Sequence, residues 1–330
     1  MEAEKNVSRG DKCMNYIEQC PDFQLQEATV VTIGKFDGRH RGHQKLLGAM
    51  LKMKETYGYQ TAVFTFSVAP GDLVEGKRHT VITTNLERKN NLQKMGIDYL
   101  VEYPFTREVS KMSAEAFVEE MLVGRMNAKA IVVGTDCGFG YRRSGNVNLL
   151  KALSGKYGYR LIVIEKEKDE DREISSTYIR EELDKGEIEK ANELLGEPYY
   201  IHGKVVHGNH IGEPVLGFPT ANLLPPPEKH LPPFGVYVAQ VWIDGKLYGG
   251  VTNIGKKPTI KGSKEQRPTG VETFVFDYEG DLYGQEIEVG LLHFIRPERK
   301  MSGLEELKSQ ITKDKDFGRA FLAERGWDNA

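Results

Sequence analysis

Cysteine, tryptophan and long apolar runs are scarce in this sequence. Its 330 residues include three cysteines and two tryptophans. A sparse, odd cysteine count argues against a disulfide framework and for a reducing compartment. Cys13 and Cys20 have no histidine nearby, so we do not expect a zinc site. The chain also lacks the run of about 18 apolar residues that a membrane-spanning helix needs, and it has no signal-peptide pattern.

An excess of one charge is also missing. The 45 basic and 48 acidic residues give a net charge of −3, and the pI is about 6.3. This balance does not favour binding to nucleic acid or to an anionic membrane, so an acidic substrate has to be bound by local geometry. The composition, with 39% hydrophobic and 28% charged residues, is typical of soluble globular proteins. Together with the cysteine count and the missing signal peptide, it leads us to expect a cytoplasmic protein.

The first half of the chain alternates between apolar, β-branched runs and helical patterns. Nearly continuous apolar strands that alternate with helices predict a doubly wound parallel sheet covered on both faces. The predicted strands are 28–34, 61–66, 98–103, 130–134 and 160–165, and the predicted helices are 43–58, 84–96, 113–127 and 146–158.

The pattern changes after Ile179. Residues 179–196 form a helical pattern broken at Gly186, and strand-forming and turn-forming residues follow. Asp244-Gly245, between two apolar runs, predicts a two-residue hairpin. Short strands at this spacing favour a small β-barrel.

Two local patterns complete the second half. The proline-rich segment 223–233 predicts an extended, stiff loop. Ser302 and Glu305 match a capping box, which predicts a helix at the C-terminal end.

The segment TIGKFDGRHRGHQKLL, Thr32–Leu47, places glycines and histidines between a predicted strand and a predicted helix. Parallel sheets bind ligands at the carboxyl ends of their strands. The helix beginning near His43 directs its free N–H groups and positive dipole end to that place, and His40 and His43 can donate hydrogen bonds to phosphate. A surface turn with incidental histidines is the alternative, but the H-x-G-H spacing favours a phosphate site.

Three segments of the first half carry a resemblance to a known family. GKFDGRHRGH resembles the H-x-G-H signature of nucleotidyltransferases, and its FDG prefix is most similar to the FMN adenylyltransferase module of bacterial bifunctional riboflavin kinase/FAD synthetases. REISSTYIR, Arg172–Arg180, is similar to the family's segment on the nucleotide phosphates. VGTDCGFGYRRSGN, 133–146, is similar to its flavin and nucleotide loop. Ser175–Thr177 can also cap a helix, which is compatible with phosphate binding.

The resemblance implies that the phosphate of FMN attacks the α-phosphorus of ATP and that pyrophosphate leaves. Positioning and stabilisation of negative charge then carry catalysis. The implied catalytic residues are His40, His43 and Arg180. The implied phosphate-binding residues are Gly34, Phe36, Asp37, Gly38, Gly42, Arg172, Ser175, Ser176 and Thr177, and the implied flavin-binding residues are Asp136, Gly138, Phe139 and Gly140.

The sequence departs from the family at three places in this half. FSVAP, 66–70, stands where the family has F-D-P-H-P. Lys35 and Asp136 each stand where an asparagine is usual. These differences concern FMN binding and adenylylation more than the fold.

A second resemblance begins at LGFPTANL, 216–223, and runs to about Glu306. This segment resembles the riboflavin kinase signature, with Gly217, Pro219, Thr220 and Asn222 implied at the nucleotide. Thr220 and Asn222 offer oxygen ligands that suit Mg²⁺ together with ATP phosphates. P-T-A-N alone could be a turn with an Asx hydrogen bond, but GVYV, GVTNIGKKPT and DLYG follow in the family's order. Glu213 stands where an arginine is common.

Glu272, in VETFVFD, matches the family's catalytic base. The implied role is to accept the proton of the ribityl 5′-hydroxyl of riboflavin as that oxygen attacks the γ-phosphate of ATP. The alternative is an exposed strand carboxylate. Phe274 replaces the histidine that is usual two residues later.

Together the resemblances imply a bifunctional enzyme that makes FMN from riboflavin and FAD from FMN, with ATP and Mg²⁺. The implied domains are an N-terminal extension (1–27), a nucleotidyltransferase domain (28–184), a linker (185–198) and a six-stranded barrel with a closing helix (199–326). Two alternatives stay open: a monofunctional riboflavin kinase with a degenerate adenylyltransferase domain, and a flavin-responsive regulator without turnover.

Overall fold

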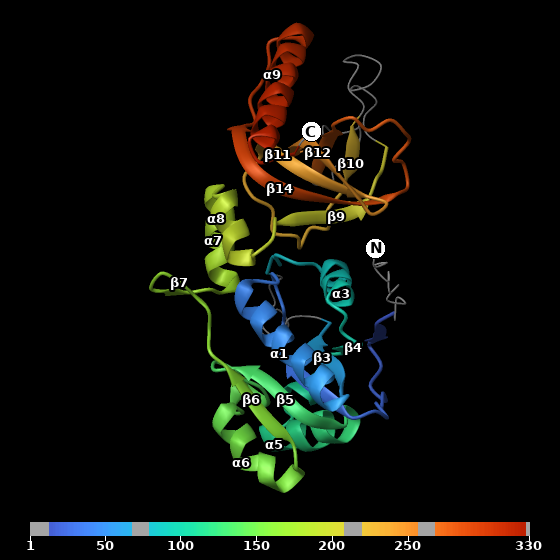
Figure 1. Cartoon of the computed structure of the whole chain (residues 1–330), viewed down its shortest axis with the longest axis vertical. Coiled ribbons are helices and arrows are strands. Elements are labelled where there is room, and N and C mark those ends of the chain that lie inside the picture. The colour runs from blue at the N-terminus through green and yellow to red at the C-terminus, as the bar shows by residue number, and fades with distance from the viewer. Residues whose placement is uncertain (1–12, 68–78, 208–219, 257–267, 328–330) are drawn as a thin grey trace, which may run out of the picture. The chain divides into compact units, whose positions relative to one another are not determined.

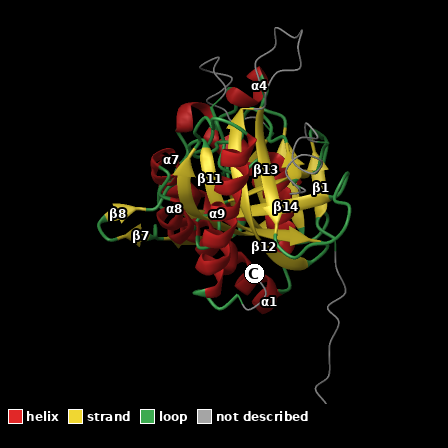
Figure 2. Cartoon of the chain, turned by 90° about the horizontal axis from the view of Figure 1, so that it is seen from above, coloured by secondary structure: helices red, strands yellow, loops and turns green. Residues whose placement is uncertain are grey.

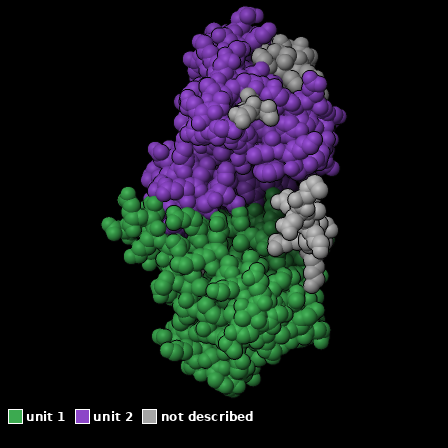
Figure 3. Space-filling view, viewed as in Figure 1, with its two compact units in different colours: residues 1–79, 83–173 green, residues 80–82, 174–330 purple. Residues whose placement is uncertain are grey.

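The computed structural model describes residues 13–67, 79–207, 220–256 and 268–327 (Figure 1). Its contacts divide the chain into two compact units (Figure 3). Unit 1 comprises residues 1–79 and 83–173, and unit 2 comprises residues 80–82 and 174–330.

Unit 1 is built on a six-stranded sheet in the order β1-β4-β3-β2-β5-β6, with every neighbouring pair parallel. The predicted parallel sheet is therefore confirmed. The pattern missed one edge strand, β1, which lies in the segment interpreted as an N-terminal extension. The strands are β1 (Asn15–Glu18), β2 (Thr29–Ile33), β3 (Gln60–Phe66), β4 (Tyr99–Tyr103), β5 (Ala128–Gly134) and β6 (Arg160–Ile164).

Helices cover both faces of this sheet. Val30 and Val63 face α1 (Arg41–Tyr57) and α3 (Asn85–Lys94), whereas Val31 and Phe64 face the helices on the opposite side. Alternate residues of each strand thus serve opposite layers, which explains why the apolar runs are continuous. The opposite layer contains α5 (Ala114–Ala116), η1 (Phe117–Arg125) and α6 (Val147–Tyr157).

The strand order places the predicted phosphate turn at a special position. β2 lies between β3 and β5, so the chain proceeds outward from β2 in both directions along the sheet. Such a switch point opens a crevice at the carboxyl ends of the two central strands. The turn after β2 and the loop after β5 both begin there.

The predicted helices of unit 1 form with recognisable ends. Thr84 and Glu87 make a capping box at the start of α3, and Gly58 and Gly158 end α1 and α6 in the left-handed region. Segment 113–127 differs from a regular α-helix, because three α-helical residues are followed by the wide turns of η1. Shorter elements are α4 (Arg107–Ser110), η2 (Tyr141–Arg143) and the antiparallel hairpin of β7 (Lys168–Asp169) and β8 (Arg172–Glu173), which is labelled in Figure 2.

Unit 2 contains a six-stranded antiparallel sheet in the order β10-β13-β12-β11-β14-β9. Val206 N donates to Asn222 O over 2.8 Å, so the second residue beyond β9 meets β10 and the sheet is nearly closed into a barrel. The predicted six-stranded barrel is therefore confirmed. Its strands are β9 (Tyr200–Lys204), β10 (Ala221–Leu223), β11 (Gly235–Ile243), β12 (Lys246–Lys256), β13 (Thr269–Val275) and β14 (Glu286–Pro297).

The predicted turn and helix break of unit 2 are also confirmed. Asp244 and Gly245 join β11 to β12 with φ values of 47° and 76°, as a tight hairpin turn requires. Gly186 ends α7 (Ser176–Lys185) with φ 80°, and α8 (Ile188–Leu195) follows. Both helices contribute to the apolar core of unit 2.

The C-terminal helix α9 (Leu304–Ala323) forms as predicted, but the predicted capping box is wrong. Gly303 is the N-cap residue, and Ser302 bonds to Glu306 rather than to Glu305, through its N and Oγ at 2.7 Å each. The helix begins one residue later than the capping pattern requires, because glycine rather than serine adopts the cap position.

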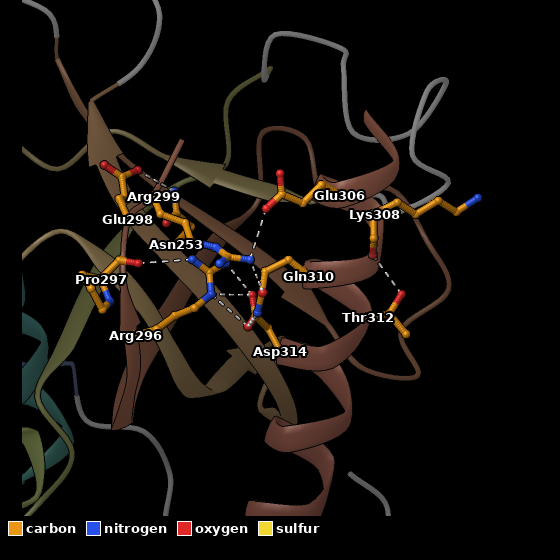
Figure 4. A network of polar contacts seen from close by, with 10 residues as sticks. All are labelled: Asn253, Arg296, Pro297, Glu298, Arg299, Glu306, Lys308, Gln310, Thr312 and Asp314. Carbon is orange, nitrogen blue, oxygen red and sulfur yellow. Dashed lines mark hydrogen bonds and ion pairs between the residues drawn. The ribbon is translucent and has the colours of Figure 1, made fainter. Parts of the chain in front are cut away.

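Polar contacts fix α9 to the barrel (Figure 4). Arg296 of β14 makes a bidentate ion pair with Asp314 of α9, with Nη2–Oδ2 at 2.6 Å and Nε–Oδ1 at 3.0 Å. Asp314 also accepts from Gln310, and its side chain is only 5% exposed. Phe321 and Leu322 pack the same helix on Val238 and Val251.

We expect Asp314→Ala to destabilise unit 2 by about 3 kcal/mol, because it leaves the Arg296 guanidinium without its carboxylate in a largely buried position. Urea unfolding followed by tryptophan fluorescence measures this change, since Trp242 and Trp327 both lie in unit 2. Glu193→Gln is the control. It breaks an exposed pair with Lys190 and should change stability by less than about 1 kcal/mol. An equally small effect of Asp314→Ala would contradict an anchoring role.

The proline-rich loop 223–233 is not extended throughout. Residues 227–228 form a turn, and Lys229 N donates to Pro226 O over 2.9 Å. Lys229 is 5% exposed, and its Nζ donates to Ile82 O at 2.7 Å and Tyr200 O at 2.8 Å. Contacts of this kind group residues 80–82 with unit 2. The domain limits 28–184, 185–198 and 199–326 stay predictions; by contacts, unit 2 resumes at Ile174.

Candidate active sites

The turn between β2 and α1 is held by hydrogen bonds from outside it. Asp37 Oδ1 accepts from Thr83 N, and Gly38 N donates to Thr83 Oγ1, each over 3.0 Å. Gly38 has φ 68°, and the buried Phe36 has φ 50°, which is unusual for an aromatic residue. Thr83 thus fixes the conformation of the FDG turn, a role that the sequence analysis did not assign.

The two histidines form one unit at the start of α1. His40 is the N-cap residue, and its Nδ1 accepts from His43 N over 3.3 Å. The rings stack with centroids 3.7 Å apart, and His43 Nδ1 lies 2.8 Å from Gly38 O. A Cβ at Gly42 would lie 3.2 Å from His40 Nδ1, so glycine there leaves room for the stack.

Burial keeps both histidines neutral. It lowers the pKa of His40 to about 2 and also lowers the pKa of His43. In the neutral state, His40 accepts at Nδ1 and therefore carries its proton on Nε2, whereas His43 donates from Nδ1 to Gly38 O. His40 can thus donate to a phosphate oxygen directly, and positive charge for the reaction has to come from other groups.

This titration makes unit 1 less stable in acid. Its sign follows from the pKa of His40, which is 6.5 in the unfolded chain and about 2 when folded. Below pH 6.5 the unfolded chain binds more protons, so the free energy of unfolding should fall, by up to about 1.4 kcal/mol per pH unit for each such group. Hydrogen exchange of the β2 and β5 amides at pH 7, 6 and 5 measures this. His40→Asn keeps an N-cap side chain and should flatten the slope; an unchanged slope would contradict the assignment.

The loop after β5 combines a charged residue with buried ones. Asp136 makes an ion pair of 3.1 Å with Lys166, and the charge of Asp136 acts on His43. Phe139 packs in the core against Phe117. Gly140 has φ 71°, and a Cβ added there would lie 2.6 Å from Ala114 Cα. The flavin contacts of Asp136, Gly138, Phe139 and Gly140 stay predictions.

The segment Arg172–Arg180 divides between the two units. Arg172 lies on β8 in unit 1 and is exposed, while Ser175 caps α7 in unit 2 and accepts from Tyr178 N over 3.2 Å. Ser176, Thr177 and Arg180 follow in the first turns of α7. The helix-cap interpretation is confirmed for Ser175, and the phosphate contacts stay predictions.

Two more of the departures from the family in unit 1 can be placed. The Lys35 side chain is exposed, and its carbonyl accepts from Arg88 Nη1 over 3.3 Å. Ser67 continues β3, with its N donating to Tyr103 O over 3.1 Å. The rest of FSVAP, residues 68–70, lies outside the described residues, as do Gly217, Pro219 and Glu213.

The second candidate site lies on unit 2, where three strands bring polar residues level. Glu272 of β13 pairs in register with Asn222 of β10 and with Asn253 of β12. Thr220 Oγ1 donates to Glu272 Oε1 over 2.8 Å, and Asn222 Nδ2 lies 3.4 Å from Thr220 Oγ1. The structure therefore brings together the three described residues that the sequence predicted for this site.

The orientation of Glu272 follows from its neighbours along β13. Val271 and Thr273 are fully buried, so Glu272 points to the opposite, outer face of the sheet and is exposed. Phe274 shares that face, where Lys315 Nζ of α9 lies 4.1 Å from its ring centroid. An accessible carboxylate beside a hydroxyl and an amide is suited to accept a proton from a bound alcohol.

The donor atoms at this site also suit a magnesium ion. Threonine hydroxyl, asparagine amide oxygen and carboxylate are the oxygen ligands that Mg²⁺ prefers, and magnesium usually takes few protein ligands together with substrate phosphates. Within the described ranges, no group of three or more His, Cys, Asp and Glu side chains could hold a metal by itself.

Comparisons with known proteins match both halves of the chain. Residues 22–178 match the family described as FAD synthetase, and residues 195–322 match riboflavin kinase. The bifunctional riboflavin kinase/FMN adenylyltransferase of Bacillus subtilis is 36% identical over 293 residues, covering 88% of this chain and 91% of the relative. The chain belongs to the bifunctional riboflavin kinase/FMN adenylyltransferase family. A relative of the same name from Haemophilus influenzae is 35% identical over 304 residues, covering 91% of this chain and 96% of its own.

A solved structure shares the fold of this family member over nearly its whole length. It is described as a macrolide-efflux protein from Streptococcus pneumoniae, with a TM-score of 0.79 and 30% identity, covering 93% of this chain and 99% of the other. In the described part of this chain, no helix is both long and apolar enough to cross a membrane.

Sequence reasoning missed the residues that hold the sites from outside the motifs. Thr83 contacts the FDG turn from 45 positions along the chain, Arg88 contacts the carbonyl of Lys35 just before it from 53 positions, and Asn253 lies beside Glu272. For Asn253, its position in GVTNIG was the available indication. For Thr83 and Arg88, the local pattern indicates only a helix start and an exposed helix.

Proposed function

We propose that unit 2 phosphorylates riboflavin at Glu272 and that unit 1 adenylylates FMN at the turn carrying His40 and His43. The observation that best supports the kinase assignment is the hydrogen bond of 2.8 Å from Thr220 Oγ1 to Glu272 Oε1. Asn222 pairs in register with Glu272 at the same place. Family membership gives the two reactions, and the proposal assigns each to its residues.

In the kinase reaction, Glu272 accepts the proton of the ribityl 5′-hydroxyl as that oxygen bonds to the γ-phosphorus of ATP and the bond to ADP breaks. Thr220 donates to the carboxylate and so orients it. Asn222, buried at 3% exposure, keeps its side chain fixed beside the reacting groups. The hydrogen bond from Thr220 supports this role over the alternative of an incidental strand carboxylate.

In the adenylyltransferase reaction, a phosphate oxygen of FMN bonds to the α-phosphorus of ATP, and the bond to pyrophosphate breaks. His40 donates from Nε2, and the start of α1 contributes free N–H groups to the phosphates. Arg180 is proposed to supply positive charge, with Gly34, Phe36, Asp37, Gly38 and Gly42 shaping the turn. Ser175, Ser176 and Thr177 are proposed to bind phosphate at the start of α7. Arg172, nearby in the sequence, is proposed to bind phosphate as well.

Mg²⁺ is proposed as the metal of the kinase site, with Thr220 and Asn222 as its protein ligands. When bound, it neutralises phosphate charge. We further propose a cytoplasmic monomer or weak homo-oligomer that acts without nucleic acid or membrane, in keeping with the net charge of −3.

Incubation with riboflavin, ATP and Mg²⁺, followed by chromatography of the flavins, tests the proposal. FAD as the end product is expected. FMN alone would indicate a monofunctional kinase with a degenerate adenylyltransferase domain. Unchanged riboflavin, with binding retained, would indicate a regulator without turnover. Both of these results would contradict the proposal.

A further inference from the structure

A buried polar network lies under the carboxyl ends of three strands of unit 1. At its centre is Arg88 of α3, 7% exposed, which forms an ion pair with Glu102 of β4, 1% exposed. Tyr16 of β1 donates to the other oxygen of Glu102. Burial, and then the Glu102 carboxylate, raise the pKa of Tyr16, so its hydroxyl stays a donor.

The guanidinium of Arg88 reaches beyond this ion pair to two loops. Nη1 donates to Lys35 O, the second residue after β2, over 3.3 Å. Nη2 donates to Asn85 Oδ1 over 3.0 Å, and Asn85 Nδ2 in turn donates to Ser67 O, just after β3, over 3.2 Å. One side chain thus fixes the first residues of the turn that carries His40 and His43 and, through Asn85, the first residue of the neighbouring loop.

We propose that Arg88 is a positioning residue for FMN adenylylation. It fixes the spacing between the turn after β2 and Ser67 just after β3, and Glu102 orients its guanidinium. The proposal rests on the assignment of adenylylation to unit 1. Phe36, next to Lys35, has φ 50° and therefore needs such external support to keep its conformation.

The chemistry of the network favours arginine over a simple buried charge. A planar guanidinium donates in several fixed directions, whereas a lysine ammonium is a compact point charge. A buried ion pair is weak evidence for a stabilising role, since an apolar or neutral pair of the same volume is often as stable. What the Arg88–Glu102 pair supplies, and a neutral pair does not, is a fixed direction for the hydrogen bonds to Lys35 O and Asn85 Oδ1.

The double variant Arg88→Met/Glu102→Gln tests this. It removes both charges, so no unpaired charge stays buried, and the amide oxygen introduced at position 102 can still accept from Tyr16. We expect kcat/KM for FMN to fall about 100-fold, because a displacement of about 1 Å at a reacting group costs that much. Riboflavin phosphorylation by the same protein should stay within about twofold, which reports on unit 2.

Steady-state constants separate positioning from mere stability. A structural role alone would reduce the folded fraction of unit 1 and lower the apparent kcat in proportion, with KM for FMN unchanged. Positioning predicts a lower kcat per folded enzyme or a raised KM for FMN. The hydrogen-exchange rates of the β2 and β5 amides should then stay near those of the wild type. Tyr16→Phe, which leaves the Arg88 contacts intact, is the matched control and should keep FAD formation within about threefold.

Two results would overturn the proposal: FAD formation by the double variant within about threefold of wild type, or a loss fully accounted for by the unfolded fraction. Arg88→Lys should recover less than a tenth of the FAD-forming activity that the double variant loses. Full recovery by Arg88→Lys would show that the guanidinium is not required. If instead His43→Ala leaves FAD formation intact, the assignment of the reaction to unit 1 fails, which is a separate outcome.

Discussion

Glu272→Gln should lower the rate of riboflavin phosphorylation by about 10²–10⁴-fold, equivalent to roughly 3–5 kcal/mol. The amide keeps the shape of the side chain and can still accept from Thr220 Oγ1, but it cannot take up the proton of the substrate hydroxyl. Binding of ATP with Mg²⁺ should change little, since Thr220 and Asn222 are unaltered. Initial rates with riboflavin and ATP measure the change.

The same variant should still convert supplied FMN to FAD, because we assign that reaction to unit 1. It would therefore depend on FMN, and riboflavin could not replace it. Glu279→Gln, which alters an exposed carboxylate just beyond β13, is the matched control and should phosphorylate riboflavin at the wild-type rate. If Glu272→Gln works within about threefold of wild type, Glu272 is not the base.

His43→Ala should reduce FAD formation from FMN by at least about 10²-fold, the scale of losing one group that stabilises transition-state charge. The change removes the ring stacked on His40 and the hydrogen bond to Gly38 O, so it disturbs both the turn and the phosphate site. Riboflavin phosphorylation should stay near normal. Parallel assays of the two reactions on one preparation measure both.

Lys52→Ala, on the exposed side of the same helix, is the control for His43→Ala and should leave both reactions unchanged. Equal loss of both reactions in His43→Ala would contradict separate sites. A loss of FAD formation alone, with FMN accumulating from riboflavin, is the expected pattern.

Much of the fold could be predicted from the sequence because its determinants are local. Each of the five predicted strands of unit 1 is an apolar run that serves two helical layers, and Gly58, Gly158 and Gly186 end helices where the pattern placed a stop. Asp244-Gly245 defined its hairpin by backbone preference alone. The H-x-G-H and P-T-A-N motifs likewise located both candidate sites because each motif is a short, local segment.

The remaining features depend on contacts between distant residues. β1 is a short strand, NYIE, whose place is decided by pairing with β4, far along the chain. Arg88 and Glu102 look like ordinary surface charges in the sequence, and only the fold buries them together. The start of α9 was placed one residue early because Ser302 can bond to a glutamate in more than one helical register.

Residues 80–82 have a consequence for any attempt to divide the enzyme. They group with unit 2, where Val81 N donates to Glu228 O over 2.7 Å, whereas the next residue, Thr83, holds Asp37 and Gly38 of unit 1. The two units are therefore interleaved along the chain. A gene divided at one codon near 174 would leave residues 80–82, which group with unit 2, on the fragment that contains unit 1. A single cut therefore cannot separate the residues of the two units along the chain.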